Sequence, residues 1–229
     1  MKFDTILWDV DGTLLNFEAA EEKSLRDGLR ACGIGIDDAQ MALYKQINRL
    51  RWERLERGEI DRQTVYISRF TDFFGRIGAR GIDPERFNED FQRALGENYV
   101  WENGARDVCE ALHGRCRMYA VTNGSAVAQH RKLEGSGLIG YLDDVFISEE
   151  MGAEKPDPRY FALCTARIPA FDPRKSLIVG DSLTSDIRGG NNAGIAACWY
   201  NPKRSVNNAG VRVDYEIGSL SEVPGLLGL

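Results

Sequence analysis

The sequence predicts an α/β protein with an open parallel sheet and an all-helical unit inserted after the first strand. Three apolar runs rich in strand-forming residues stand out: "TILWDV" at 5–10, "RMYAVTN" at 117–123 and "SLIVGDS" at 176–182. Each run is nearly continuous in its hydrophobicity and ends in small or acidic residues, which is typical of parallel strands covered on both faces. Weaker runs at 144–150 and 195–200 follow the same pattern.

Helical patterns lie between the predicted strands. They cover residues 125–136, 157–167 and 184–193, and the second opens with Asp157 as its cap and Pro158 in its first turn. Strands that alternate with helices indicate an open α/β sheet whose strands are joined by right-handed crossovers.

Residues 18–100 break this alternation, because their apolar residues recur with a helical period and no strand pattern is present. Asp83, Pro84 and Glu85 have the residue types of a helix cap, a first-turn proline and a first-turn acid. We therefore predict a core domain of residues 1–17 and 101–229 and a helical domain of residues 18–100. The periodic apolar positions are Leu43, Ile47, Leu50, Ile67, Phe70, Phe74, Ile77, Phe87, Phe91 and Leu95.

The composition is that of a globular protein and limits the classes of partner. Of 229 residues, 43% are hydrophobic and 28% are charged, and the net charge of -6 provides no broad field to attract nucleic acid. The five cysteines show no metal-binding or disulfide spacing, and the N-terminus carries no export signal, so we expect a reduced, cytoplasmic chain. No apolar run is long enough to span a membrane.

Two acids one residue apart end the first predicted strand, in "TILWDVDGTLLNF". Residues i and i+2 of a strand project to the same side, so the carboxylates of Asp9 and Asp11 are expected to converge where open α/β sheets bind ligands. Their repulsion would destabilise the fold unless a cation lies nearby, and Mg²⁺ prefers such oxygen ligands. Gly12 allows a sharp turn and Thr13 offers a hydroxyl. An EF-hand loop does not fit, because its glycine would fall at the wrong position.

Polar residues also follow the other predicted strands. Thr122 and Asn123 end the strand at 117–123, Asp181 ends the strand at 176–182, and Lys155 and Asp186 lie in following segments. Each residue alone has an ordinary structural explanation, such as a helix cap or a surface lysine. Together, at the ends of strands of one sheet, they indicate a phosphate and metal site.

The combination resembles the haloacid dehalogenase superfamily of aspartyl-phosphate hydrolases. The resemblance covers residues 1–17 and about 100–200 and implies a Rossmann-like core, with the helical domain as a cap inserted after the first motif. The four motifs of the superfamily are matched in order by Asp9–Thr13, Thr122, Lys155 with Pro156, and Asp181 with Asp186.

The resemblance also implies a mechanism. Asp9 would attack phosphorus and form an aspartyl phosphate, while Asp11 would protonate the leaving oxygen and then activate water. Mg²⁺ would be held by Asp9, the carbonyl of Asp11 and Asp181, with Asp186 nearby or bound through water. The residues that this mechanism assigns to catalysis and phosphate binding, besides the two acids, are Thr122, Asn123 and Lys155.

The helical cap is expected to select the leaving group. "CWYNP" at 198–202, with the longer motif stretches, most resembles the pyrimidine-nucleotide 5′-phosphatases of the superfamily. In "NRLRW", Trp52 could stack on a base and Asn48 could bind a base edge, although Trp52 could equally belong to the cap interior.

Several alternative functions remain open at this point. They are a phosphoglycolate or sugar-phosphate phosphatase, a phosphomutase, a dehalogenase and a phosphoacceptor signalling domain. The expected partner is a small phosphomonoester, with no nucleic acid polymer and no membrane, and the chain is expected to be a monomer or homodimer.

Overall fold

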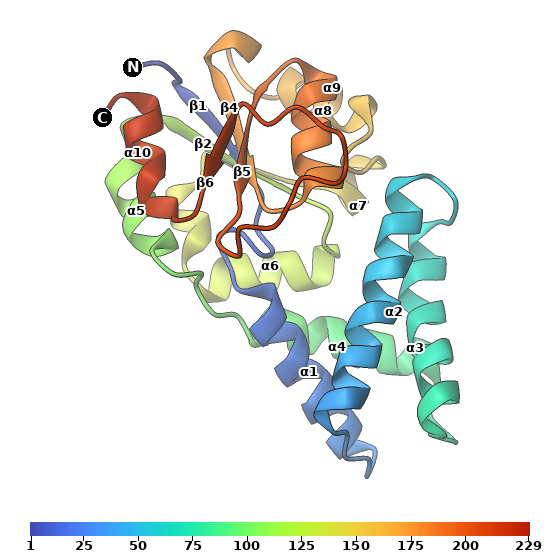
Figure 1. The fold of residues 1–229 in the computed structure, drawn as a ribbon. Coiled ribbons are helices and arrows are strands. Elements are labelled where there is room, and N and C mark those ends of the chain that lie inside the picture. Colours follow the sequence, from blue (N-terminus) through green and yellow to red (C-terminus); the bar gives the residue numbers. More distant parts are fainter.

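The computed structural model describes all residues, 1–229, and confirms the predicted α/β fold. Six parallel strands form one sheet in the order β3-β2-β1-β4-β5-β6, so the first strand lies in the middle (Figure 1). Both termini lie at the end of the sheet that is remote from the helical domain (Figure 1). The strands are β1 Thr5–Trp8, β2 Arg117–Thr122, β3 Asp144–Ile147, β4 Ser176–Gly180, β5 Ala196–Tyr200 and β6 Tyr215–Ile217.

Helices cover both faces of the sheet. The α-helices are α1 Phe17–Ala31, α2 Asp38–Glu56, α3 Arg62–Ile77, α4 Pro84–Glu97, α5 Ala105–Leu112, α6 Ala126–Gly135, α7 Ser148–Met151, α8 Pro158–Ala166, α9 Arg188–Ala193 and α10 Val223–Leu227. Shorter turns are the 3₁₀-helices η1 Leu138–Tyr141, η2 Pro173–Lys175 and η4 Leu220–Glu222, and the π-helix η3 Leu183–Ile187.

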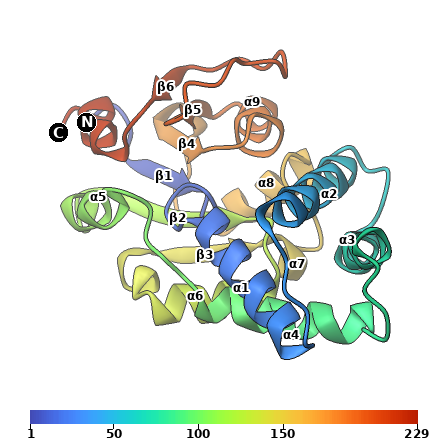
Figure 2. The ribbon, with the colours of Figure 1, turned by 60° about the horizontal axis from the view of Figure 1, so that its bottom comes forward.

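Successive side chains of the central strand β1 pack into two separate hydrophobic cores, one on each face of the sheet. Ile6 and Trp8 pack with α5 and α10 on one face, whereas Leu7 packs with α8 on the other. Figure 2 shows α5 and α10 on one side of the sheet and α8 and α9 on the other. Because successive side chains of a strand point to opposite faces, a strand buried on both faces must be apolar throughout. This requirement explains the unbroken apolar run that predicted β1.

Helices α1–α4 form a separate group beyond the carboxyl end of β1 (Figure 1). Their interior is rich in aromatic residues, with Tyr44, Phe70 and Phe91 among those buried, and it includes Ala128 of α6. The bounds of 18–100 for this domain stay a prediction, because α4 also packs on α6 of the core.

Some details differ from the predicted pattern. Leu50, one of the expected apolar positions, is 43% exposed on α2. The helix expected at 184–193 is divided into the π-helix η3 and the short α9. Helix α5 was not predicted, and α7 occupies the end of the strand predicted at 144–150, whereas α1 was predicted only as part of the all-helical segment 18–100. None of the helices has the length and hydrophobicity that a membrane crossing requires.

The aromatic interior generates a test of the stability of the helical domain. Phe70 is fully buried and packs edge-on against Phe87 and Phe91. We expect Phe70→Ala to lower the free energy of unfolding by about 3–5 kcal/mol in urea titrations, because it leaves a cavity. The control Leu50→Ala, on an exposed position, should change it by less than about 0.5 kcal/mol. Equal losses in both variants would contradict the packing described.

Candidate active site

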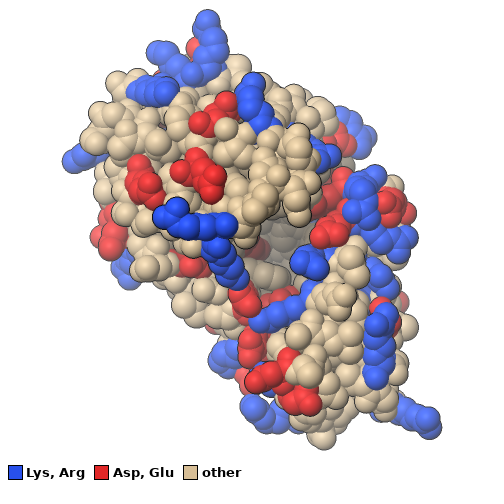
Figure 3. Space-filling view, in the orientation of Figure 1, with Lys and Arg blue, Asp and Glu red and all other residues tan.

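A cavity opens where the carboxyl ends of β1, β2 and β4 face the helical domain. Its walls are built from both parts of the protein: Asp9, Thr122 and Asp181 from the core, and Trp52 and Arg69 from the helical domain. Figure 3 shows the hollow between the two parts, with charged side chains along its rim. A cavity with such mixed walls places a bound molecule in contact with both domains.

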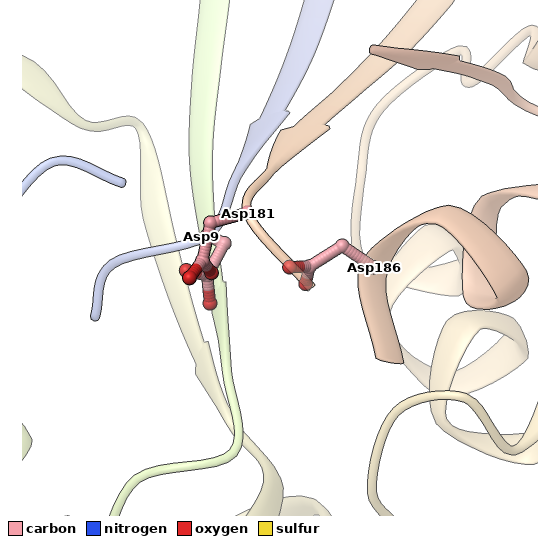
Figure 4. Close-up of side chains that lie close together, drawn as sticks. All are labelled: Asp9, Asp181 and Asp186. Carbon is pink, nitrogen blue, oxygen red and sulfur yellow. The ribbon is translucent and has the colours of Figure 1, made fainter. Parts of the chain in front are cut away.

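Three carboxylates gather at the base of this cavity. Asp9 follows β1, Asp181 follows β4, and Asp186 lies in η3, and Figure 4 shows their side chains converging. One oxygen of each lies within 4.8 Å of the others. Asp9 and Asp186 are buried, whereas Asp181 retains surface in the open part of the cavity.

The ammonium group of Lys155 lies among these acids. It donates hydrogen bonds of 2.7 Å to Asp9 Oδ1, to Asp186 Oδ1 and to the carbonyl oxygen of Val121. Lys155 is only 1% exposed, so the alternative of a solvated surface lysine is wrong. Burial alone would lower the pKa of Lys155, but the charges of Asp186 and Asp9 raise it above its ordinary value.

The single positive charge of Lys155 does not balance the three carboxylates. Burial and the charge of Asp186 raise the pKa of Asp9 to about 7. Burial and the charges of Asp9 and Asp186 raise the pKa of Asp181 well above its ordinary value. With all three ionised, the cluster holds two more negative charges than Lys155 balances. A divalent cation with a preference for oxygen ligands fits this donor set.

Two glycines permit the close approach of the acids. Gly12 has φ of +90°, and a Cβ there would lie 2.6 Å from Asp181 Oδ2. A Cβ on Gly180 would lie 2.2 Å from Asp186 Oδ2. Any side chain at either position would therefore displace a carboxylate of the cluster.

Asp11 lies in the cavity but its carboxylate is not part of the cluster. Its Oδ2 accepts from Gln129 Nε2 at 2.6 Å and its Oδ1 accepts from Lys132 Nζ at 2.5 Å. The predicted convergence of the Asp9 and Asp11 carboxylates is not seen in the acid cluster, because the ammonium group of Lys132 pairs with Asp11 instead. Metal binding through the Asp11 carbonyl stays a prediction. Gln129 and Lys132, three residues apart on α6, were not identified from the sequence, although both are polar and fall on one helix face.

The side chains of Thr122 and Asn123, which were predicted to bind phosphate, already form hydrogen bonds within the protein. Thr122 is buried, and its Oγ1 accepts from the N–H of Gly124 at 3.1 Å. The side chain of Asn123 is committed to the main chain of Lys155, accepting from its N–H at 2.9 Å and donating to its carbonyl at 2.8 Å. Asn123 therefore fixes the position of Lys155, and both residues line the cavity.

Of the two helical-domain residues predicted to contact the substrate, Trp52 lines the cavity and Asn48 does not. Trp52 lines the cavity, with its ring edge-on to Tyr66 and the guanidinium of Arg62 5.9 Å from its centroid. Asn48 is 4% exposed and is absent from the cavity wall. Its amide donates to Glu21 at 2.6 Å and accepts from Arg69 at 3.0 Å. The hypothesis that Asn48 binds a base edge is therefore not supported, since both ends of its amide are already bonded.

Trp199, the tryptophan of the "CWYNP" motif, contacts the main chain of Asp181. Trp199 in β5 donates from Nε1 to the carbonyl oxygen of Asp181 at 2.8 Å. This bond fixes the main chain from which the Asp181 carboxylate projects.

The chain is similar in sequence and fold to several known proteins. Residues 3–194 match the family model of haloacid dehalogenase-like hydrolases. The HAD-hydrolase YfnB of Bacillus subtilis is 36% identical over 228 residues, covering 100% of this chain and 97% of that protein. A crystal structure of YfnB bound to magnesium superposes with a TM-score of 0.95 and covers 100% of both chains. The pyrimidine 5′-nucleotidases PynA of Streptococcus pneumoniae and YjjG of Escherichia coli are 35% and 30% identical, covering 97% and 99% of this chain and 94% and 99% of those proteins.

The charge balance around Lys155 generates a stability prediction. In EDTA, Lys155→Met should lower the free energy of unfolding by about 3–5 kcal/mol at pH 8, because it leaves buried carboxylates without a partner. The loss should be smaller at pH 5. The pKa of Asp9 is raised from 3.8 to about 7, so its carboxyl group is protonated in the folded protein at pH 5 and ionised at pH 8.

Urea titrations at the two pH values measure this effect. The matched control is Arg174→Met, which breaks an ion pair whose arginine is 87% exposed and should leave the free energy of unfolding nearly unchanged at either pH. A loss for Lys155→Met that did not grow with pH would contradict the charge argument.

Proposed function

The chain belongs to the haloacid dehalogenase-like hydrolases, and from this we propose that it is a Mg²⁺-dependent phosphatase that hydrolyses pyrimidine nucleoside 5′-monophosphates. The observation that carries the proposal is the buried carboxylate of Asp9, bonded to Lys155 beside two further acids at the base of a cavity. The full-length likeness to two pyrimidine 5′-nucleotidases supports the class of substrate.

Magnesium would be held by Asp9, Asp181 and the main-chain carbonyl of Asp11, with Asp186 as a direct or water-bridged ligand. The excess negative charge of the cluster and the presence of magnesium in the YfnB crystal support this choice. When bound, the ion would neutralise charge that develops on the phosphoryl oxygens.

Asp9 would act as the nucleophile. Thr13 Oγ1 donates to Asp9 Oδ2 at 3.0 Å and Lys155 donates to Oδ1, so the orientation of the carboxylate is fixed from both sides. Attack on phosphorus forms an aspartyl phosphate and breaks the bond to the leaving oxygen. Lys155 and Thr122, both on the cavity wall, would bind oxygens of the transferred group.

Asp11 would act as the acid and base of the reaction. In the substrate complex, Asp11 in its protonated form would give its proton to the leaving oxygen, and the resulting carboxylate would then take a proton from the water that hydrolyses the aspartyl phosphate. Gln129 and Lys132 contact one oxygen each, and these contacts hold the carboxyl group at the cavity wall.

The helical domain would select the leaving group. Trp52 and Phe17 contribute aromatic surface to the cavity, on which a nucleobase can stack. A sugar phosphate or phosphoglycolate has no aromatic ring and would leave this surface unused.

A panel of phosphomonoesters tests the proposed reaction and its nucleophile. We expect UMP and dTMP to have a higher kcat/KM than ribose 5-phosphate or phosphoglycolate. Asp9→Asn should remove at least about 10⁴-fold of kcat, because the amide cannot form the phosphoenzyme. Asp11→Asn should also lose phosphatase activity while the protein remains folded, as circular dichroism would show. Full activity of either variant would contradict the role assigned to that residue.

The proposed metal site predicts a stabilising effect of magnesium. At 100 times its dissociation constant, Mg²⁺ should stabilise the protein by about 2.7 kcal/mol, which raises the melting temperature by several degrees over the value in EDTA. Differential scanning fluorimetry measures the shift. Asp181→Asn should abolish most of it, whereas the surface control Asp172→Asn should keep it. An equal shift in both variants would contradict the assignment of Asp181.

A further inference from the structure

Glu56 of α2 is an acid of the helical domain that lines the active-site cavity. It follows Trp52 by one helical turn, and residues four apart on a helix project from the same face. In agreement with this spacing, both side chains form part of the cavity wall. Glu56 also retains accessible surface. A molecule bound in the cavity can therefore contact its carboxyl group.

The carboxyl group of Glu56 lies close to the acid cluster at the base of the cavity. Helix α2 contacts η3, which carries Asp186, and the Thr184 hydroxyl of η3 donates to Glu56. Burial and the charge of Asp186 raise the pKa of Glu56 to about 7, against the opposing effects of Thr184 and Lys155. Glu56 therefore lies within electrostatic reach of the residues proposed to bind the phosphate.

Glu56 has no basic partner of its own. The neighbouring acids Glu53 and Glu59 each pair with an arginine. No lysine or arginine is hydrogen-bonded to Glu56, and the ammonium group of Lys155 is bonded to two other acids. Two carboxylate oxygens can accept about four hydrogen bonds, so Thr184 leaves much of this capacity free for a ligand.

The position of Glu56 indicates which part of a nucleotide it meets. The acid cluster binds the phosphate in the proposed function, and Trp52 lies one turn of α2 from Glu56, a separation of about 5–6 Å between the Cβ atoms. Along the cavity wall the order is therefore acid cluster, Glu56, Trp52. A nucleoside 5′-monophosphate has the matching order of phosphate, sugar and base, which places the sugar at Glu56.

The chemistry of the carboxyl group agrees with this placement. A phosphate oxygen has no proton to donate to a carboxylate and carries the same sign of charge. Sugar hydroxyls are neutral donors, and the two oxygens of a carboxylate can accept from hydroxyls on adjacent carbons. An acidic residue binds a ribose hydroxyl in the same way in dinucleotide-binding folds.

We propose that Glu56 is a specificity-determining residue that accepts hydrogen bonds from the sugar hydroxyls of the substrate. The inference rests on the proposed phosphatase function and adds to it recognition of a hydroxylated sugar next to the phosphate. Glu56 acts on binding of the leaving nucleoside and takes no part in transfer of the phosphoryl group.

The first test uses the unmodified protein, so no folding defect can affect it. It compares UMP with 2′,3′-dideoxy-UMP, which lacks both sugar hydroxyls and is otherwise identical. We expect kcat/KM at pH 8, where Glu56 is ionised, to be lower for the dideoxy substrate by about tenfold or more, because hydrogen bonds to a charged group are lost. Equal values for the two substrates would overturn the assignment of Glu56 and leave the phosphatase proposal standing.

The second test assigns the preference to the residue. In Glu56→Ala the ratio of the two kcat/KM values should fall to within about threefold of unity, because only UMP loses hydrogen bonds. Glu56→Gln should retain part of the preference, since its amide oxygen still accepts. The matched control is Glu53→Ala, an acid of α2 that pairs with Arg49 and is absent from the cavity wall, and it should retain the full preference.

Two outcomes of the variant test would contradict the proposals in different ways. A loss in Glu56→Ala of equal size on UMP and on the dideoxy substrate would show a role unrelated to the sugar and would overturn this inference alone. Absence of activity of the unmodified protein on every phosphomonoester would overturn the proposed function and this inference with it.

Discussion

The ammonium group of Lys155, enclosed by Asp9, Asp186 and the end of β2, is the interaction on which the site depends. The strands β1 and β4 bring Asp9 and Asp181 to one edge of the sheet, and η3, which follows β4, adds Asp186. Coulomb repulsion would oppose that arrangement without a buried cation. One lysine does not balance three carboxylates. The folded protein therefore keeps unbalanced negative charge at the carboxyl edge of the sheet, and this charge makes the edge suited to bind a divalent cation. Stability and the proposed chemistry have a common electrostatic origin.

Polar contacts at several points, together with the packing of α4 on α6, connect the helical domain to the core. Arg62, at the start of α3, donates to the carbonyl oxygen of Asn123 at 2.7 Å and to Ser148 Oγ at 2.6 Å. Gln92 of α4 accepts from Ser125, and α4 packs along α6. Each of these contacts reaches a segment that borders the phosphate end of the cavity. The position of the helical domain and the shape of the cavity are therefore linked through the loop after β2.

The sequence predicted the parts of this protein that depend on local pattern. Buried parallel strands require continuous apolar runs, so the strands and the acids at their ends could be found. The bounds of helix α1 were not identified within the predicted helical segment, because its buried apolar side is nearly limited to Ala20, Leu25 and Leu29, too few for a clear period. Asn48 was misplaced because helical spacing does not tell which side of α2 faces the cavity. Gln129 and Lys132 gain their importance from partners distant in the sequence, which no local pattern reveals.

The two ends of the helical domain lie side by side. Leu15 forms an isolated antiparallel bridge with Trp101, and the N–H of Asn16 donates to the carbonyl of Val100 at 2.8 Å. Residues 17–99 thus leave and re-enter the core at nearly one point. The core can accordingly accept exchange of this segment during evolution or engineering. A different segment grafted at this point would leave the acids of the core unchanged. It would need to provide only the substrate-binding side of the cavity and surfaces that pack on α6 and on the loop after β2.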